Sequence, residues 1–142
     1  MSKGNTWEND LLKLLFNATA VANIADNAGT SPLTNLYVSL HTADPGEAGT
    51  QTTSECAYAG YARVAVARTS GGWTVTNNQV VPAANVDFPP ATGGSETATF
   101  FGIGTASSGA GKLLYSGAIS PTIAIANGVT PRLTTATAVT ED

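Results

Sequence analysis

The chain has 142 residues, of which 11% are charged and 42% are hydrophobic, and its net charge is −4. This length suits one folded domain, and the combination of high hydrophobicity with low net charge excludes a disordered chain. The few basic residues are scattered, which excludes a nucleic-acid partner, and the apolar runs are far shorter than the ~20 residues that cross a bilayer, so no membrane partner is expected.

The first residues predict an amphipathic helix. Apolar side chains recur there at spacings of three and four, which places one set on a single helix face: Trp7, Leu11, Leu14, Ala18, Val21 and Ala25. Asn5 followed by Glu8 is typical of a helix N-terminus. Gly29 and Pro32 are expected to end the helix.

This apolar stripe is wider than one packing face requires, because Leu12, Leu15 and Phe16 extend it. We therefore expect residues 1–30 to form a helix or arm that contacts a partner, and residues 31–142 to form a separate β domain. The interface candidates are the apolar residues of the first turns: Trp7, Leu11, Leu14 and Leu15.

Beyond residue 32 the period changes to two, which indicates β-strands. Strands are predicted over 36–41, 61–68, 73–75, 80–81, 86–88, 97–103, 113–118, 123–125 and 133–139. Turn signals separate them, among them Gly71-Gly72, Asn77-Asn78, Gly93-Gly94 and the hairpin-type pair Asn127-Gly128. Short strands at this spacing predict a mainly β fold, an antiparallel sandwich or jelly-roll-like domain with one N-terminal α-helix.

Two glycine-containing segments come near a cofactor motif without completing it. Residues 106–113 read ASSGAGKL, where a phosphate loop needs glycine in place of Ala106 and a hydroxyl residue in place of Leu113. The segment 102–104 begins like a dinucleotide fingerprint, but Ser107 takes the place of the last glycine. A flexible loop and a strand end are the better interpretations, and no cofactor is expected.

Catalytic and metal sites are not expected either. His41 is the single histidine, and no serine has the surroundings of a nucleophile. One histidine and the single Cys56 do not make a zinc site, and the loop carboxylates Asp44, Glu47 and Glu55 lack calcium-loop spacing. We expect His41 to be hydrogen-bonded to a nearby loop at the end of its strand. The lone thiol fits synthesis in a reducing host cytoplasm.

Several segments, in order, resemble a family of small virion structural proteins of tailed bacteriophages and prophages. They are 36–49 (LYVSLHTADPGEAG), 60–66 (GYARVAV), 86–94 (VDFPPATGG), 101–104 (FGIG) and 113–117 (LLYSG). Members of that family carry two labels, head decoration (cement) protein and tail fibre protein. The resemblance implies a virion component that is not an enzyme, and it brings no catalytic residues.

The expected function is head decoration, with the protein on the capsid surface. Its expected partners are the major capsid protein and further copies of itself, as a homotrimer. The low charge fraction agrees with packed subunit contacts, where long charged side chains lose rotamer entropy. A tail or tail-fibre component is the alternative. A carbohydrate-binding module is a third interpretation, which rests on Tyr58 and Tyr61 near Asp44.

Overall fold

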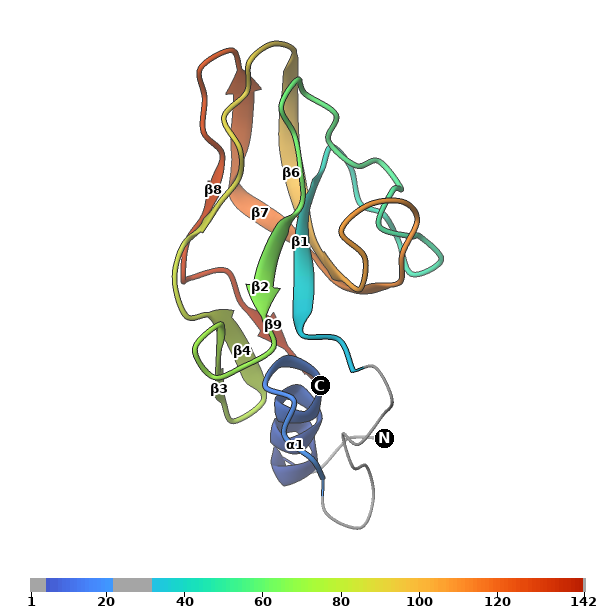
Figure 1. Cartoon of the computed structure of the whole chain (residues 1–142), viewed down its shortest axis with the longest axis vertical. Helices are drawn as coiled ribbons and strands as arrows, with labels where there is room; N and C mark the ends of the chain where they lie inside the picture. Colours follow the sequence, from blue (N-terminus) through green and yellow to red (C-terminus); the bar gives the residue numbers. More distant parts are fainter. Residues whose placement is uncertain (1–4, 22–31, 142) are drawn as a thin grey trace. The chain divides into compact units, whose positions relative to one another are not determined.

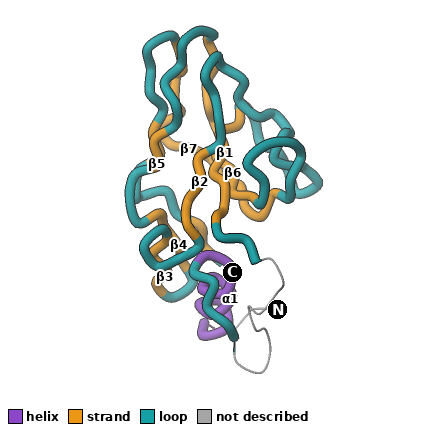
Figure 2. Tube along the Cα trace, viewed as in Figure 1, coloured by secondary structure: helices purple, strands orange, loops and turns teal. Residues whose placement is uncertain are grey.

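The computed structural model describes residues 5–21 and 32–141 of the chain. One helix and nine strands are present in these residues (Figure 1): α1 (Asn5–Phe16), β1 (Asn35–His41), β2 (Val64–Ala67), β3 (Trp73–Thr76), β4 (Gln79–Pro82), β5 (Val86–Asp87), β6 (Ser95–Gly104), β7 (Leu113–Ala126), β8 (Arg132–Leu133) and β9 (Val139–Thr140). Apart from α1, the described chain consists of strands, loops and turns (Figure 2). The expectation of a mainly β, antiparallel, sandwich-like fold with one helix is confirmed. The described helix is too short to cross a membrane.

The chain folds into two compact units. Unit 1 groups Met1–Asn35, Val66–Asn85 and Thr134–Asp142, and unit 2 groups Leu36–Ala65 and Val86–Leu133. The expected division at residue 30 falls within residues 22–31, outside the described residues, and stays a prediction. The helix itself groups with β3, β4 and β9 in unit 1.

In unit 1, α1 packs on the hairpin formed by β3 and β4. Leu12 and Phe16, one helical turn apart, are fully buried, and the Phe16 ring meets Trp73 edge to face at a centroid distance of 4.8 Å. The hairpin closes through the predicted turn, where Asn77 adopts a φ of 54°, a conformation that asparagine tolerates better than most residues. Strand β9 pairs with the far side of β4 and adds the buried Val139.

The helix ends at Phe16, so the prediction of a longer helix is wrong for residues 17–21, and its remainder lies outside the described residues. The cause is Arg68, whose guanidinium donates to the carbonyls of Leu14 and Leu15 at 2.9 and 2.6 Å. Further helical turns would need these same two carbonyls. Ala18 instead takes a φ of 52°, and the chain turns away.

Unit 2 contains β6, β7 and all of β1 after Asn35 from the sheet with the order β2-β1-β6-β7, and it contains the short pair β5-β8. The alternation of apolar Leu36, Val38 and Leu40 with Tyr37, Ser39 and His41 predicts that β1 is half-buried. In the structure Ser39 and His41, on the predicted outer face, are fully buried, as are the three apolar residues. The expectation is wrong because the loop that follows β1 folds back on this face, where the Thr53 carbonyl oxygen lies 2.8 Å from Nδ1 of His41. The segment 36–41 is therefore a central strand covered on both faces.

The predicted strands 113–118 and 123–125 are joined in one strand, β7. Its pairing with β6 is irregular, because Ala98 lies opposite Ile123 while Phe100 lies opposite Ala118. Residues 119–122 therefore form a bulge within β7, and a second register shift lies between Ile103, opposite Tyr115, and Gly104, opposite Leu113.

The single strand predicted over 133–139 is instead two, β8 and β9, which pair with different partners. A turn separates them, with the amide of Thr137 donating to the Thr134 carbonyl at 3.0 Å. The turn at Asn127-Gly128 forms as predicted, with a φ of 86° at Gly128, but it is not a hairpin, because β7 pairs with β6 and β8 pairs with β5.

Candidate functional site

The predicted interface residues of α1 lie on the flanks of its buried face. Leu11, Leu14 and Leu15 are half-buried, whereas the residues turned to the β3–β4 hairpin are Leu12 and Phe16. Only the backbone of Trp7 is described. Core packing therefore uses the residues that were expected merely to widen the stripe, and the four interface candidates stay predictions.

In unit 2, the single histidine belongs to a buried hydrogen-bonded chain. The Nδ1 of His41 lies 2.8 Å from the Thr53 carbonyl oxygen, and its Nε2 lies 2.8 Å from the Ser39 hydroxyl. A carbonyl only accepts, so Nδ1 carries the proton and Nε2 accepts from Ser39. Burial lowers the pKa of His41, which favours this neutral form. His41 thus holds the loop to its strand, as the sequence indicated.

An ion pair between Arg63 and Glu55 joins two loops of unit 2. Both guanidinium–carboxylate hydrogen bonds are short, 2.7 and 2.8 Å, and the Arg63 side chain is only 3% exposed. The same guanidinium donates to the carbonyls of Ala106 and Gly109 at 2.9 and 2.7 Å. Arg63 therefore ties the 42–57 loop to the 105–112 loop. The hydroxyl of Tyr61 donates to Glu55 as well, at 2.8 Å.

Gln51 makes a second tie between the same loops. The side-chain oxygen of Gln51 accepts a hydrogen bond from the backbone amide of Ala106 at 2.9 Å. The backbone amide of Gln51 donates to the Ala110 carbonyl at 2.8 Å. The side chain is fully buried and fits a space that exists because Gly104 and Gly111 have no Cβ: an added Cβ would lie 2.2 and 2.0 Å from Gln51 atoms. The two loops form one fixed surface.

This geometry explains the two motifs that came near a cofactor site. Gly102 lies within β6, where an added Cβ would lie 2.6 Å from the Nε2 of His41 and 2.7 Å from the Ser39 hydroxyl. These glycines make room for buried side chains of the protein itself. The carbonyls of Ala106 and Gly109, in the loop that resembled a phosphate loop, accept hydrogen bonds from Arg63.

The aromatic residues behind the carbohydrate-binding interpretation pack against each other, edge to face, at a centroid distance of 5.3 Å. Tyr58 is 4% exposed and donates to the Pro89 carbonyl at 2.8 Å, and Tyr61 stacks on Phe88 at a centroid distance of 6.4 Å. Burial raises the pKa of both phenols, that of Tyr58 to about 12. Tyr58 is thus buried and Tyr61 half-buried, which does not favour a sugar-binding role for these two rings. Cys56 is buried too, and burial raises the pKa of its thiol to about 12, which disfavours the reactive thiolate.

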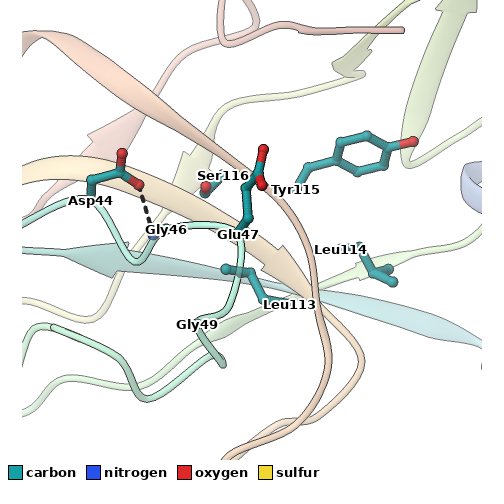
Figure 3. Close-up of a pocket in the computed structure, with 8 residues that line it drawn as sticks. All are labelled: Asp44, Gly46, Glu47, Gly49, Leu113, Leu114, Tyr115 and Ser116. Atoms are coloured by element: carbon teal, nitrogen blue, oxygen red, sulfur yellow. Dashed lines mark hydrogen bonds between the residues drawn. The ribbon is translucent and has the colours of Figure 1, made fainter.

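The three loop carboxylates are separated in space. Glu55 forms an ion pair with Arg63. Asp44 and Glu47 are exposed and line an open groove of about 400 Å³ (Figure 3). One oxygen of Asp44 accepts from the Gly46 amide at 2.9 Å. The opposite wall is the start of β7, residues 113–116. Among the described residues there is no group of three histidine, cysteine, aspartate or glutamate side chains that could hold a metal ion.

The start of β7 is also an edge of the four-stranded sheet. The order β2-β1-β6-β7 leaves the outer side of β7 without a strand partner in the described part of the chain. No charged residue occurs between Lys112 and Arg132, although natural edge strands are commonly protected by charges. Sequence reasoning missed this surface, because it identifies a strand but does not say which strands lie at the edge of a sheet.

The arrangement as a whole suits a scaffold that presents loops and a sheet edge. The side chains of His41, Gln51 and Arg63 are engaged in hydrogen bonds within the protein. Two buried polar atoms, Oδ1 of Asn17 and Nε1 of Trp73, have no hydrogen-bond partner among those described.

Comparison with known proteins agrees with the resemblance noted in the sequence. No curated protein matches the chain. A sequence model of the family described as "Podophage GP4 fiber I protein gp80" matches residues 2–140, nearly the whole chain. The chain therefore belongs to this family of phage virion structural (fibre) proteins.

Proposed function

We propose that this protein is a non-catalytic structural subunit of a tail-associated fibre in a podophage-type virion. The observation that carries the proposal is the match to a fibre protein family over residues 2–140. The fixed pair of loops supports it, because Arg63 and Gln51 hold a presented surface in place without help from a ligand. Loops held by a rigid scaffold are where binding functions commonly lie.

The proposal that the protein is not an enzyme rests on how its potential catalytic groups are used. The serine–histidine pair, Ser39 and His41, has the spacing of a nucleophile and a base, but both side chains are fully buried. A substrate carbonyl would have to reach the serine oxygen within the core of unit 2. The buried thiol of Cys56 is likewise held in its unreactive form.

Head decoration, the function expected from the sequence, is the second candidate. It is favoured by the low charge and by the lack of repetitive, collagen-like or coiled-coil fibre sequence in the chain. In that function the protein would bind the major capsid protein and stabilise the head shell through many modest contacts. The description of the matching family favours a fibre subunit over a head decoration protein.

A deletion of the gene separates the two functions in one experiment. Particles without a fibre subunit should have heads that retain DNA on heating, but they should fail in adsorption or tail assembly. Their image reconstruction should lack density at the tail and not on the capsid. Particles that adsorb normally yet release DNA at lower temperature, with density missing from the capsid surface, would replace the fibre proposal with head decoration.

A further inference from the structure

We propose that Asn127 is a site of spontaneous deamidation, and that the hydrogen bond from the Gly128 amide to Ala91 sets the rate of this modification. Such a change would occur in a fibre subunit and in a head protein alike. Three features of unit 2 support it: an exposed Asn-Gly pair, the hydrogen bonds that hold the backbone of this pair, and the contacts that depend on those bonds.

The turn between β7 and β8 contains the single Asn-Gly pair of the chain (Figure 1). Both residues are exposed, and the amide of Val129 donates to the Ala126 carbonyl at 2.9 Å, which closes the turn around them. Asparagine is one of the thermolabile residues of proteins. A following glycine favours its loss, because a residue without a Cβ does not hinder the approach of its own backbone nitrogen to the asparagine side chain.

The reaction needs the backbone amide of Gly128 in its deprotonated form. Hydroxide removes the amide proton, and the nitrogen then attacks the side-chain carbonyl carbon of Asn127. The side-chain nitrogen takes a proton from water and leaves as ammonia, and a succinimide ring remains. Water opens this ring at either carbonyl, which gives an aspartyl or an isoaspartyl residue at position 127. In the isoaspartyl product the chain runs through the former side chain, so the backbone is one carbon longer.

In the folded protein the attacking amide is already engaged. Gly128 donates its backbone N–H to the Ala91 carbonyl at 2.7 Å, and the amide of Ala91 donates to the Val129 carbonyl at 2.8 Å. Ala91 is only 2% exposed, so these two hydrogen bonds fix the turn to a buried residue. The Gly128 nitrogen can lose its proton and attack only after its hydrogen bond opens. Deamidation should therefore follow the local opening of this turn, which costs less free energy than unfolding of the whole protein or at most the same.

The contact at Ala91 also holds the next part of unit 2. The amide of Thr92 donates to the Ala59 carbonyl at 2.8 Å, and the amide of Ala59 donates to the Gly93 carbonyl at 3.0 Å. An extra backbone carbon at position 127 changes the spacing between Ala126 and Gly128, and with it the fit of the turn to Ala91. We therefore expect the isoaspartyl form to be less stable than the aspartyl form, which keeps the normal backbone.

The test compares deamidation of the full-length protein in buffer and in urea above the unfolding midpoint, at the same pH and temperature. Peptide mapping by mass spectrometry should show the isoaspartyl product at position 127 in both samples, and it should form at least about tenfold more slowly in the folded protein. Asn85, which is exposed but is followed by the β-branched Val86, is the internal control and should stay unmodified over the same period.

Hydrogen exchange provides a quantitative check. Exchange and attack both need the Gly128 amide deprotonated after the same opening, so its protection factor should equal the slowing of deamidation to within about threefold. Equal deamidation rates in folded and unfolded protein would overturn the proposal, as would a well-protected Gly128 amide beside fast deamidation. So would the absence of isoaspartate after long incubation in urea.

A variant separates the effect of charge from that of the backbone. Asn127→Asp adds the same negative charge with a normal backbone, and its urea midpoint should stay near that of the wild type. The isoaspartyl fraction, isolated from aged protein by ion exchange, should unfold at a lower urea concentration. If Asn127→Asp lowered the midpoint as much as the isoaspartyl product does, the contribution assigned to the contact with Ala91 would be wrong.

Discussion

The ion pair of Arg63 with Glu55 should be the most sensitive polar contact of unit 2. The Arg63 guanidinium makes four hydrogen bonds, two to the Glu55 carboxylate and one each to the carbonyls of Ala106 and Gly109. Arg63→Ala removes all four and leaves a carboxylate that is only 14% exposed without its cation. Breaking one side of a buried pair costs about 3–5 kcal/mol. We expect the low end, about 3 kcal/mol, because Glu55 keeps some solvent contact and the hydrogen bond from Tyr61.

The measurement is urea unfolding followed by far-ultraviolet circular dichroism. A loss of this size, out of a usual total of about 5–15 kcal/mol, should lower the midpoint by roughly 1–2 M urea. Hydrogen exchange should show where the stability is lost. The amide of Gln51, which donates to the Ala110 carbonyl at 2.8 Å between the two loops, should exchange faster in the variant.

The chain supplies a matched control in Arg132, which pairs with Asp87 but is exposed, as is its partner. Arg132→Ala removes the same residue type and the same kind of bidentate contact, and it should leave the urea midpoint nearly unchanged, because exposed pairs are screened by water. If Arg63→Ala lowered the midpoint no more than Arg132→Ala, the tie between the two loops would be energetically unimportant and the reasoning would be refuted.

Two further substitutions test the packing of each unit. Gly104→Ala should lower the free energy of unfolding in urea by about 1–3 kcal/mol, because the added Cβ would lie 2.2 Å from a Gln51 atom. Gly93→Ala is the control and should cost clearly less, because its added Cβ would lie 3.6 Å from the nearest atom. Equal losses in the two variants would count against the proposed space for Gln51. Phe16→Ala should cost about 3–5 kcal/mol, because the ring is fully buried against Trp73, and a variant of unchanged stability would mean that α1 is an arm and not part of the core.

The sequence was sufficient for features that depend on neighbouring residues. The turn at Asn77-Asn78 and the strand that follows it were predicted because the alternation and the turn residues are local signals. The same holds for the fold class, since short alternating segments separated by turns have few other solutions. The start of α1 at Asn5 was predicted for the same reason.

What the sequence could not predict depends on residues far apart in the chain. The helix ends at Phe16 because Arg68, more than fifty positions away, takes the carbonyls that a longer helix would use. The apolar period continues past this point, so periodicity alone predicts a longer helix. Likewise Gln51 and Gly104 have ordinary surroundings in the sequence, and only the fold brings them into contact.

The candidate surface at β7 shows the same limit more sharply. The segment 113–118 was predicted as a strand, but its position at the edge is a property of the sheet order, which depends on pairings between strands distant in sequence. The interface candidates that the sequence did provide, on α1, came from a stripe wider than one face. In the structure two residues of this stripe, Leu12 and Phe16, are buried in the core of unit 1.

Stability in mild acid should depend on His41, the single histidine. Burial lowers the pKa of His41 in the folded protein, whereas in the unfolded chain it titrates near its ordinary value of about 6.5. Below that pH the unfolded chain binds a proton that the folded protein does not. The contribution of His41 to the free energy of unfolding is therefore fully present above about pH 6.5. It is lost as the pH falls toward the lowered pKa of the folded protein, by at most about 1.4 kcal/mol per pH unit.

Because the other acidic groups also titrate as the pH falls, the quantity to measure is the difference between wild type and His41→Gln. The wild-type free energy of unfolding should fall more steeply between about pH 6.5 and 5 than that of the variant, which has no titrating group at this position. Asp87, whose pKa Arg132 holds low, contributes in both proteins and cancels. Parallel curves in this interval, or a single histidine signal in a nuclear magnetic resonance titration with an ordinary or raised pKa, would contradict the neutral form in which His41 accepts from Ser39 and donates to Thr53.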